Sequence, residues 1–273
     1  MPFTAVPKPV LTRIACTSLV RILAWHAVVI MGLLTASSSV RAQSNQSEVV
    51  PAERALFEAL NRERIAQGLP ALQWDGALAA AARDHAMRMA QRNTLSHQLP
   101  GEPAVQDRAT RAGARFSLIA ENIAVAPTPA SIHSAWMESP HHRENILDPE
   151  LNVVGIAVVK GGDGLFAVQD FSQSVANLSF SQQEQVILAN LHARGLRGAQ
   201  STDDARKTCD MERGFAGTRP LSVVRFEVSD LSKLPEDLEQ KIRSGKYHAA
   251  AVGACQGGNS GSFSRFRIAV VLY

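Results

Sequence analysis

Apolar residues recur at helical spacing in the first part of the chain. A helix is expected from Pro51 to the residue before Gly68, because its apolar side chains fall on one side. Asp75 has a suitable side chain to cap a second helix. The apolar stripe of that second helix consists of Leu78, Ala82, His85 and Met89. This spacing buries His85, and a single histidine on a buried face is more often a hydrogen-bonded core residue than a metal ligand.

Shorter elements follow and indicate a small sheet between helices. Helices are expected over residues 104–112 and from Thr128 through Trp136. Three segments have the pattern of strands: 118–125, 153–159 and 165–171. The last two are joined by a glycine-rich turn with no helix behind it, which predicts a hairpin and not a phosphate-binding loop.

The last third of the chain has its own helix and strand pattern. Ser181 and Glu184 have the spacing of a capping box, which predicts a helix up to Gly195. The polar segment 198–217 is expected to be irregular. Strands are predicted over 221–228, 247–255 and 263–272, with a glycine-rich hairpin loop before the last of them. No internal repeat and no low-complexity tract is evident in the sequence.

The N-terminus has the features of a secretion signal. Lys8, Arg13 and Arg21 precede an apolar run over residues 22–34, and Val40-Arg41-Ala42 has the small residues of a cleavage site. The run is shorter than the roughly 20 residues that span a membrane, although a retained anchor stays an open alternative. We therefore predict a signal peptide over 1–42, a polar linker over 43–50, and a chain that is secreted, extracellular or periplasmic, with no stable membrane span after cleavage.

The net charge excludes one class of partner. The chain has 28 Lys and Arg against 25 Asp and Glu, a charge of +3. Residues 1–42 contain four basic and no acidic residues, so removing +4 from +3 leaves −1. A mature chain near neutrality lacks the basic surface that binding to DNA or RNA requires, so we expect no nucleic-acid partner.

The cysteines indicate one disulfide. Cys16 would leave with the signal peptide, so that Cys209 and Cys255 remain in an oxidising compartment. A bridge between them would contribute about 4 kcal/mol to stability in the chain-entropy model.

The densest group of chemically useful side chains is Trp136-Met-Glu-Ser-Pro-His-His-Arg-Glu-Asn-Ile-Leu147. Ser139 followed by Pro140 predicts a helix start, because proline is tolerated in the first helical turn. On that helix His142 shares a face with Ile146, whereas His141 is rotated by about 100°. At most one of the two histidines is therefore expected to point into a given site.

Three separated motifs together resemble one protein family. Ser96-His97, Ala120-Glu121-Asn122-Ile123 and Ser139-Pro-His-His-Arg-Glu-Asn-Ile-Leu147 occur in the order and spacing of the CAP superfamily. That family comprises cysteine-rich secretory proteins, antigen 5, plant pathogenesis-related proteins and bacterial SCP-like extracellular proteins. The following segment, Val154-Gly-Ile-Ala-Val158, is similar to the core strand of the family.

The resemblance covers residues 51–175 and implies an α+β fold, an α–β–α sandwich. Residues 179–273 lie outside it and are expected to form a small, disulfide-linked α+β domain of unknown role.

The resemblance also implies a cleft that gathers two histidines and two acidic residues. By position these are His97 and His142 as the metal-facing pair, with Glu102 and Glu121 beside them as candidate catalytic groups. Imidazole suits Zn²⁺, but structural zinc uses four ligands and catalytic zinc about three, so two histidines predict a weak, exchangeable ion. Structural roles are expected for Asn122, Arg143 and Asn145.

Three functions remain open from the sequence. The leading one is a binding or effector module whose cleft holds an extracellular ligand, a peptide or a labile divalent metal. The second is a metal-assisted hydrolase of the peptidase type, for which no oxyanion donor can be recognised. The third is a lipid or sterol carrier. The binding module requires the fewest assumptions, and the prediction leans against an enzyme.

Overall fold

The computed structural model describes residues 36–257 and 262–273. The apolar part of the expected signal peptide, Cys16 and most of the glycine-rich loop before the last strand lie outside the described residues. Among the residues that are described, no helix is both long and apolar enough to cross a membrane.

The first helix begins earlier than its sequence pattern predicts. Helix α2 spans Ala36–Ala66, so residues 43–50, the expected linker, are helical. Pro51 lies inside this helix instead of opening it. A proline removes one backbone donor but does not force a helix to end, and the preceding residues, which include alanine, glutamine and glutamate, accept helical backbone.

A four-stranded sheet forms the centre of the first part of the chain. Its strands are β1 (Gln73–Trp74), β2 (Phe116–Ala126), β3 (Val153–Gly161) and β4 (Gly164–Ser174). They lie in the order β1-β3-β4-β2, with β1 parallel to β3 and the other neighbours antiparallel. The predicted hairpin of β3 and β4 is confirmed, and β2 is an edge strand.

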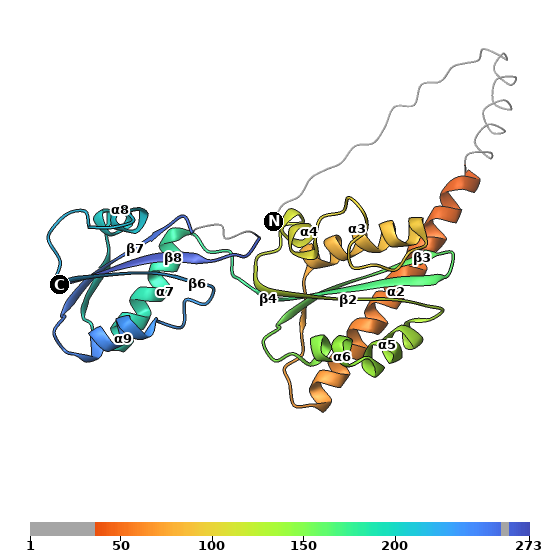
Figure 1. Ribbon diagram of the computed structural model, residues 1–273, viewed down its shortest axis with the longest axis horizontal. Helices are drawn as coiled ribbons and strands as arrows, with labels where there is room; N and C mark the ends of the chain where they lie inside the picture. Colours follow the sequence, from red (N-terminus) through yellow and green to blue (C-terminus); the bar gives the residue numbers. More distant parts are fainter. Residues whose placement is uncertain (1–35, 258–261) are drawn as a thin grey trace, which may run out of the picture. The chain divides into compact units, whose positions relative to one another are not determined.

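Helices cover both faces of this sheet (Figure 1). The α2 helix, α5 (Pro129–Glu138) and α6 (Pro140–Leu147) pack on one face. The α3 helix (Gly76–Arg92) packs on the other, and α4 (Val105–Arg111) follows it. The arrangement is an α–β–α sandwich, as expected.

The α3 helix follows its predicted pattern closely. Asp75 is the N-cap, and its carboxylate accepts the backbone N–H of Leu78 at 2.8 Å. All four residues of the predicted stripe are buried. The helix can lie flat on the sheet because Gly155 of β3 has no side chain, and a Cβ atom there would collide with the backbone of Leu78 and Ala79.

Arg64 supports the end of α6 from within the core. Its side chain is 1 % exposed and donates to the carbonyl oxygens of Ile146 at 2.9 Å and Asp148 at 2.8 Å. It also donates to the carbonyls of Pro70 and Leu151. One buried guanidinium thus satisfies the carbonyl groups that a helix end leaves unpaired.

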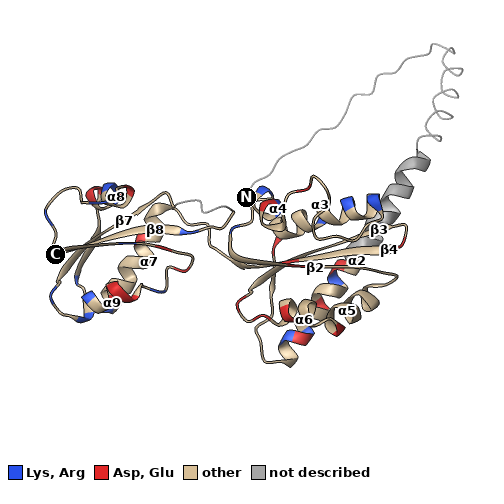
Figure 2. Cartoon of the chain, in the orientation of Figure 1, with Lys and Arg blue, Asp and Glu red and all other residues tan. Residues whose placement is uncertain are grey.

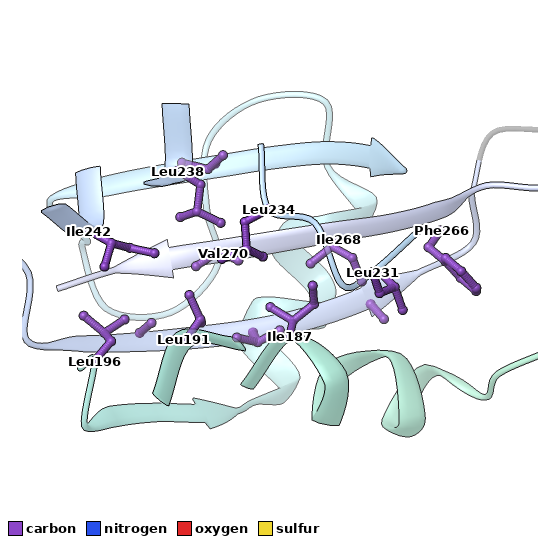
Figure 3. Close-up of a cluster of buried hydrophobic side chains, with 14 of the residues drawn as sticks. Ile187, Leu191, Leu196, Leu231, Leu234, Leu238, Ile242, Phe266, Ile268 and Val270 are labelled. Carbon is purple, nitrogen blue, oxygen red and sulfur yellow. The ribbon is translucent and has the colours of Figure 1, made fainter. Parts of the chain in front are cut away.

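A second four-stranded sheet contains the remaining strands: β5 (Gly198–Ser201), β6 (Ser222–Val228), β7 (Ala249–Cys255) and β8 (Phe266–Leu272). Their order is β5-β7-β8-β6. Helices α7 (Phe180–Ala193) and α9 (Glu236–Arg243) enclose an aliphatic core against one face of this sheet (Figure 3). The α8 helix (Asp203–Asp210) lies on the other face, and residues of both charge signs share α8 and α9 (Figure 2).

Two expectations for this region are wrong. The capping box of α7 is made by Ser179 and Gln182 and not by Ser181 and Glu184, because Glu184 is buried and bonded elsewhere. The polar segment 198–217 contains β5 and α8 and is therefore not irregular. The predicted disulfide is confirmed: Cys209 of α8 is bonded to Cys255 of β7, with a Cα–Cα distance of 5.8 Å.

Replacing Arg64 by methionine should lower the free energy of unfolding by about 2–4 kcal/mol, because several buried carbonyl groups lose their donor. Urea denaturation followed by circular dichroism measures this loss. Arg62→Met on the exposed side of the same helix is the matched control, with an expected change within about 0.5 kcal/mol. Equal effects of the two substitutions would show that Arg64 does not hold α6.

Candidate functional site

Glu121 is the centre of the candidate site. It lies in the edge strand β2 and is 9 % exposed, so its charge must be compensated by neighbouring groups. Arg108 of α4, itself buried, forms a short ion pair with one carboxylate oxygen. His97 Nδ1 lies 2.8 Å from the other. Both oxygens of Glu121 are therefore engaged by cationic or donating groups.

His97 is held at the surface of the site by this hydrogen bond. It lies in the loop between α3 and α4, and its side chain is 59 % exposed. A carboxylate can only accept, so Nδ1 donates the proton and the lone pair of Nε2 is left free. The hydrogen bond to Glu121 raises the pKa of His97 above its usual value.

His142 reaches the same place from the opposite face of the sheet. Its backbone carbonyl accepts the side-chain amide of Asn122 at 3.0 Å, which ties α6 to β2. Burial lowers the pKa of its ring, and the nearby charges of His97 and His141 lower it further. Its Nδ1 is buried and has no hydrogen-bond partner among the described residues. The backbone of α6 at His142 is thus tied to β2, the strand whose Glu121 binds His97.

Glu102 lies in a second layer beneath the cleft. Both of its carboxylate oxygens are 2.9 Å from Nδ1 of His85, and the two side chains are buried. Glu102 also accepts the backbone N–H of Leu99. His85 is therefore the hydrogen-bonded core histidine that the α3 pattern predicts. The Glu102 carboxylate supports the loop that carries His97.

Asp170 of β4 is fully buried and is paired with Glu121 on the neighbouring strand β2. Burial and the negative charge of Glu121 raise its pKa well above the usual range, although Arg108 opposes the shift. Neither of its oxygens has a hydrogen-bond partner among the described residues.

Two members of the site were not recognised in the sequence, Arg108 and Asp170. Arg108 also donates to the backbone carbonyls of His97 and Pro103, so one guanidinium positions the whole loop. The signal for Asp170 is an acidic residue within a strand segment that is mostly apolar, Ala167-Val-Gln-Asp-Phe171. Arg108 has no such signal, because an arginine in a short helix is ordinarily solvent-exposed.

The predicted supporting residues connect α5, α6 and β2. The Asn145 amide donates to Asn122 Oδ1 at 2.9 Å, and Asn122 is fully buried. Arg143 is exposed and donates to the carbonyl of Met137 at 3.4 Å. Trp136 is buried in the core, and its indole N–H donates to the carbonyl of Ile123. These contacts hold the helix of His142 against the strand of Glu121.

Comparison with known proteins agrees with this architecture. The cysteine-rich secretory protein family, CAP, matches residues 57–171. This part of the chain is a CAP domain. The match includes His97, Glu121 and His142.

The curated relatives match about half of this chain. The uncharacterized protein YkwD of Bacillus subtilis is 35 % identical over 129 residues, which are 47 % of this chain and 50 % of YkwD. The uncharacterized membrane protein YlbC of the same organism is 27 % identical over 135 residues, 49 % of this chain and 39 % of YlbC. This chain therefore matches half or less of the length of either relative.

Solved structures with similarity include an extracellular SCP-domain protein of Bacillus anthracis. It is 27 % identical with a TM-score of 0.45, over 48 % of this chain and 43 % of that protein. An outer surface protein of Borrelia burgdorferi is 22 % identical with a TM-score of 0.43, over 45 % of this chain and 93 % of that protein.

The donors of the CAP cleft are suited to a loosely held metal ion. Within the described parts of the chain, no three or more His, Cys, Asp and Glu side chains are grouped to hold a metal. His97 Nε2 and the ring of His142 can each offer a nitrogen lone pair to a metal ion, whereas both Glu121 oxygens are already bonded within the protein. Two imidazoles fall short of the three or four protein ligands of tightly bound zinc, so the residues fit a labile ion and not a permanent one.

Replacing Asp170 by asparagine should change how stability depends on pH. A carboxyl group whose pKa is raised by folding makes its full contribution to the stability of the folded state below its unfolded pKa of about 3.9. This contribution is lost as the pH rises through the pKa of the folded state. Asparagine keeps a donor toward Glu121 without that titration. The variant should therefore gain stability relative to the natural chain between pH 4 and pH 8, as measured by urea denaturation at several pH values. A constant difference across this range would show that Asp170 does not hold a proton.

Proposed function

We propose that the CAP domain is a binding module whose His97 and His142 hold a labile divalent metal ion, with Zn²⁺ as the best match. The observation that carries this proposal is the hydrogen bond from His97 Nδ1 to Glu121 at 2.8 Å. A carboxylate behind a histidine fixes the ring tautomer and its orientation and makes the free nitrogen a better donor. Glu121 therefore supports a ligand instead of acting as one.

The electrostatics of the cleft support exchangeable binding. The lowered pKa of His142 keeps its ring neutral near pH 7, which is the form that binds metal. The raised pKa of His97 makes protons compete with the ion. A bound ion would supply a positive centre for a carboxylate or carbonyl of a ligand, while His97 and His142 hold and orient it.

The hydrolase alternative receives less support from the same geometry. A general base needs a free carboxylate or imidazole within reach of the substrate. Arg108 and His97 occupy both oxygens of Glu121, and His85 occupies those of Glu102. Neither candidate catalytic residue is thus poised to accept a proton. The lipid-carrier alternative has no specific contact in its favour.

Secretion is part of the proposal and rests on the N-terminal sequence. The basic residues, the apolar run and the small residues before position 43 form a signal peptide pattern. The Cys209–Cys255 disulfide agrees with folding in an oxidising compartment. The ligand would then be met outside the cytoplasm.

Zinc titration by calorimetry of the chain without residues 1–42 tests the assignment. The natural chain should show saturable binding, and His97→Ala/His142→Ala should abolish it without changing the circular dichroism spectrum. His141→Ala is the matched control, because the side chain of His141 is 94 % exposed. The proposed site is wrong if the double variant binds zinc as the natural chain does.

Glu121→Gln should weaken zinc binding by about 10–100-fold, the usual effect of removing a carboxylate behind a metal-binding histidine. Calorimetry measures the change, and an unaltered circular dichroism spectrum shows that the pair with Arg108 is not required for folding. Glu144→Gln changes an exposed glutamate of α6 and should leave the affinity within twofold. An unchanged affinity in the Glu121 variant would remove the supporting role of this carboxylate.

A further inference from the structure

The two sheets of the chain have the same topology. The first is ordered β1-β3-β4-β2 and the second β5-β7-β8-β6, each with one parallel pair, β1 with β3 and β5 with β7. In each part of the chain, the two central strands are consecutive and antiparallel. They are preceded, in chain order, by a helix, an edge strand, a second helix, the opposite edge strand and a further helical segment. We propose that residues 180–272 are a second, reduced copy of the CAP fold that has kept the framework and lost the site.

The start of the second helix is anchored identically in both copies. Asp75 caps α3 and its backbone N–H donates to the carbonyl of Val154, the last residue that pairs with β1. Thr202 caps α8 and its backbone N–H donates to the carbonyl of Val252, the last residue that pairs with β5. Each capping side chain accepts the N–H of the residue three positions later. The two caps are therefore equivalent positions.

The helix crosses the sheet at an equivalent glycine. Gly155 and Gly253 directly follow the two anchoring valines. A Cβ atom on Gly155 would collide with the third and fourth residues after the Asp75 cap, and one on Gly253 would collide with the third and fourth residues after the Thr202 cap. The close approach of helix and strand is the same in both copies.

In both copies, a buried glutamate from the first helix accepts a backbone N–H of the central strand that no neighbouring strand binds. Each short edge strand leaves part of its longer neighbour unpaired. Glu53 of α2 accepts the backbone N–H of Val158 at 3.2 Å, and Glu184 of α7 accepts that of Ala254 at 3.0 Å. Each glutamate is also paired with an arginine from the helix on the other face, Arg83 in the first copy and Arg206 in the second.

The core residues of these first helices have equal spacing. Leu56 and Leu60 follow Glu53 by three and seven positions, and both are buried against the first sheet. Ile187 and Leu191 follow Glu184 by three and seven positions, and both are buried against the second. The strand residues that the glutamates bind differ by two positions, since Val158 is three residues after Gly155 and Ala254 is one residue after Gly253, but the helix face that packs is the same.

The strand pairing shows which residues of the second sheet occupy the positions of the site residues. Gly155 lies opposite Asp170, which lies opposite Glu121. In the second copy Gly253 lies opposite Ala269, which lies opposite Arg225. The acidic centre of the cleft is thus replaced by an arginine and an alanine. Arg225 is committed to the backbone carbonyls of Thr208 and Gly214.

The segments that carry the histidines are also changed. The first copy uses residues 93–115, with His97 and α4, between α3 and β2, whereas the second uses only residues 211–221, which contain no histidine. Two helices, α5 and α6, precede β3, whereas α9 alone precedes β7. We therefore expect one His/Glu cleft in each chain. This expectation about ligand number rests on the proposed function, and the equivalence of the frameworks does not.

The correspondence assigns a counterpart to the disulfide. Cys209 is seven residues after its cap and Cys255 two residues after its glycine. At these places the first copy has Ala82 and Ala157, which are fully buried and belong to one core cluster. Ala82→Cys/Ala157→Cys should consequently form a disulfide within the CAP domain. A bridge requires Cα atoms within about 4.4–6.8 Å, and Cys209–Cys255 meets that condition.

Mass spectrometry of the oxidised full chain after proteolysis tests this bridge. Ala82→Cys/Ala157→Cys should give a peptide linked between positions 82 and 157, while Cys209–Cys255 stays intact. Ala81→Cys/Ala157→Cys moves one cysteine about 100° around α3 and should leave both introduced thiols free. If Ala82→Cys and Ala157→Cys each fold alone but the double variant keeps both introduced thiols free, the proposed equivalence is wrong.

A second variant tests the equivalence in case the introduced cysteines do not fit the core of the CAP domain. Cys209→Ala/Cys255→Ala recreates the alanine pair of the CAP domain and should keep a folded circular dichroism spectrum at 25 °C. If this variant unfolds and the single cysteine variants of the CAP domain also unfold, the equivalence is rejected.

Zinc stoichiometry tests the loss of the site separately. One ion per chain, removed by His97→Ala/His142→Ala, is the expected result. Residual binding that survives in this variant and is located in residues 180–272 would overturn the loss of the site. Absence of zinc binding in the natural chain would overturn the proposed function while agreeing with a second copy that has no site.

Discussion

A carboxylate buried in the edge of a sheet must be neutralised by its neighbours, and for Glu121 this requirement organises the CAP cleft. Arg108 supplies a positive charge, His97 donates a hydrogen bond, and the charge of Glu121 together with burial raises the pKa of the neighbouring Asp170 carboxyl group. The partners come from a helix, a loop and a strand, so neutralising one charge fixes three segments. Arg108 extends this effect through its bonds to the backbone of the His97 loop.

The two glutamate carboxylates of the site are consequently hydrogen-bonded within the protein, and the two imidazole rings of the cleft carry nitrogen atoms that remain without a partner among the described residues. The second layer, Glu102 with His85, is buried beneath the loop and is saturated by its own hydrogen bonds. From the other face, Asn122 and Asn145 fix the helix of His142 to the same strand. Both glutamate side chains of the site are therefore already bonded within the protein.

The framework that supports this site is used twice. In each sheet a glycine lets a capped helix lie on the central strand, and a glutamate from the opposite helix closes the strand edge. These devices are backbone contacts and buried hydrogen bonds, which many side-chain sequences can accommodate around them. Fold and site can thus be separated: the second copy preserves the contacts that form the sandwich, while Arg225 and Ala269 stand where Glu121 and Asp170 form the cleft.

The sequence by itself determined the elements whose cause is local. The Asp75 cap, the buried stripe of α3, the β3–β4 hairpin and the approach of His97, Glu121 and His142 could be read from spacing and from the family motifs. Tertiary structure decided the rest. Helix α2 runs through Pro51, the α7 cap lies at Ser179, and Arg108 is buried against Glu121. The repeated topology was also invisible, because strand order and the partners of buried charges depend on contacts between residues far apart in the chain, which no local pattern records.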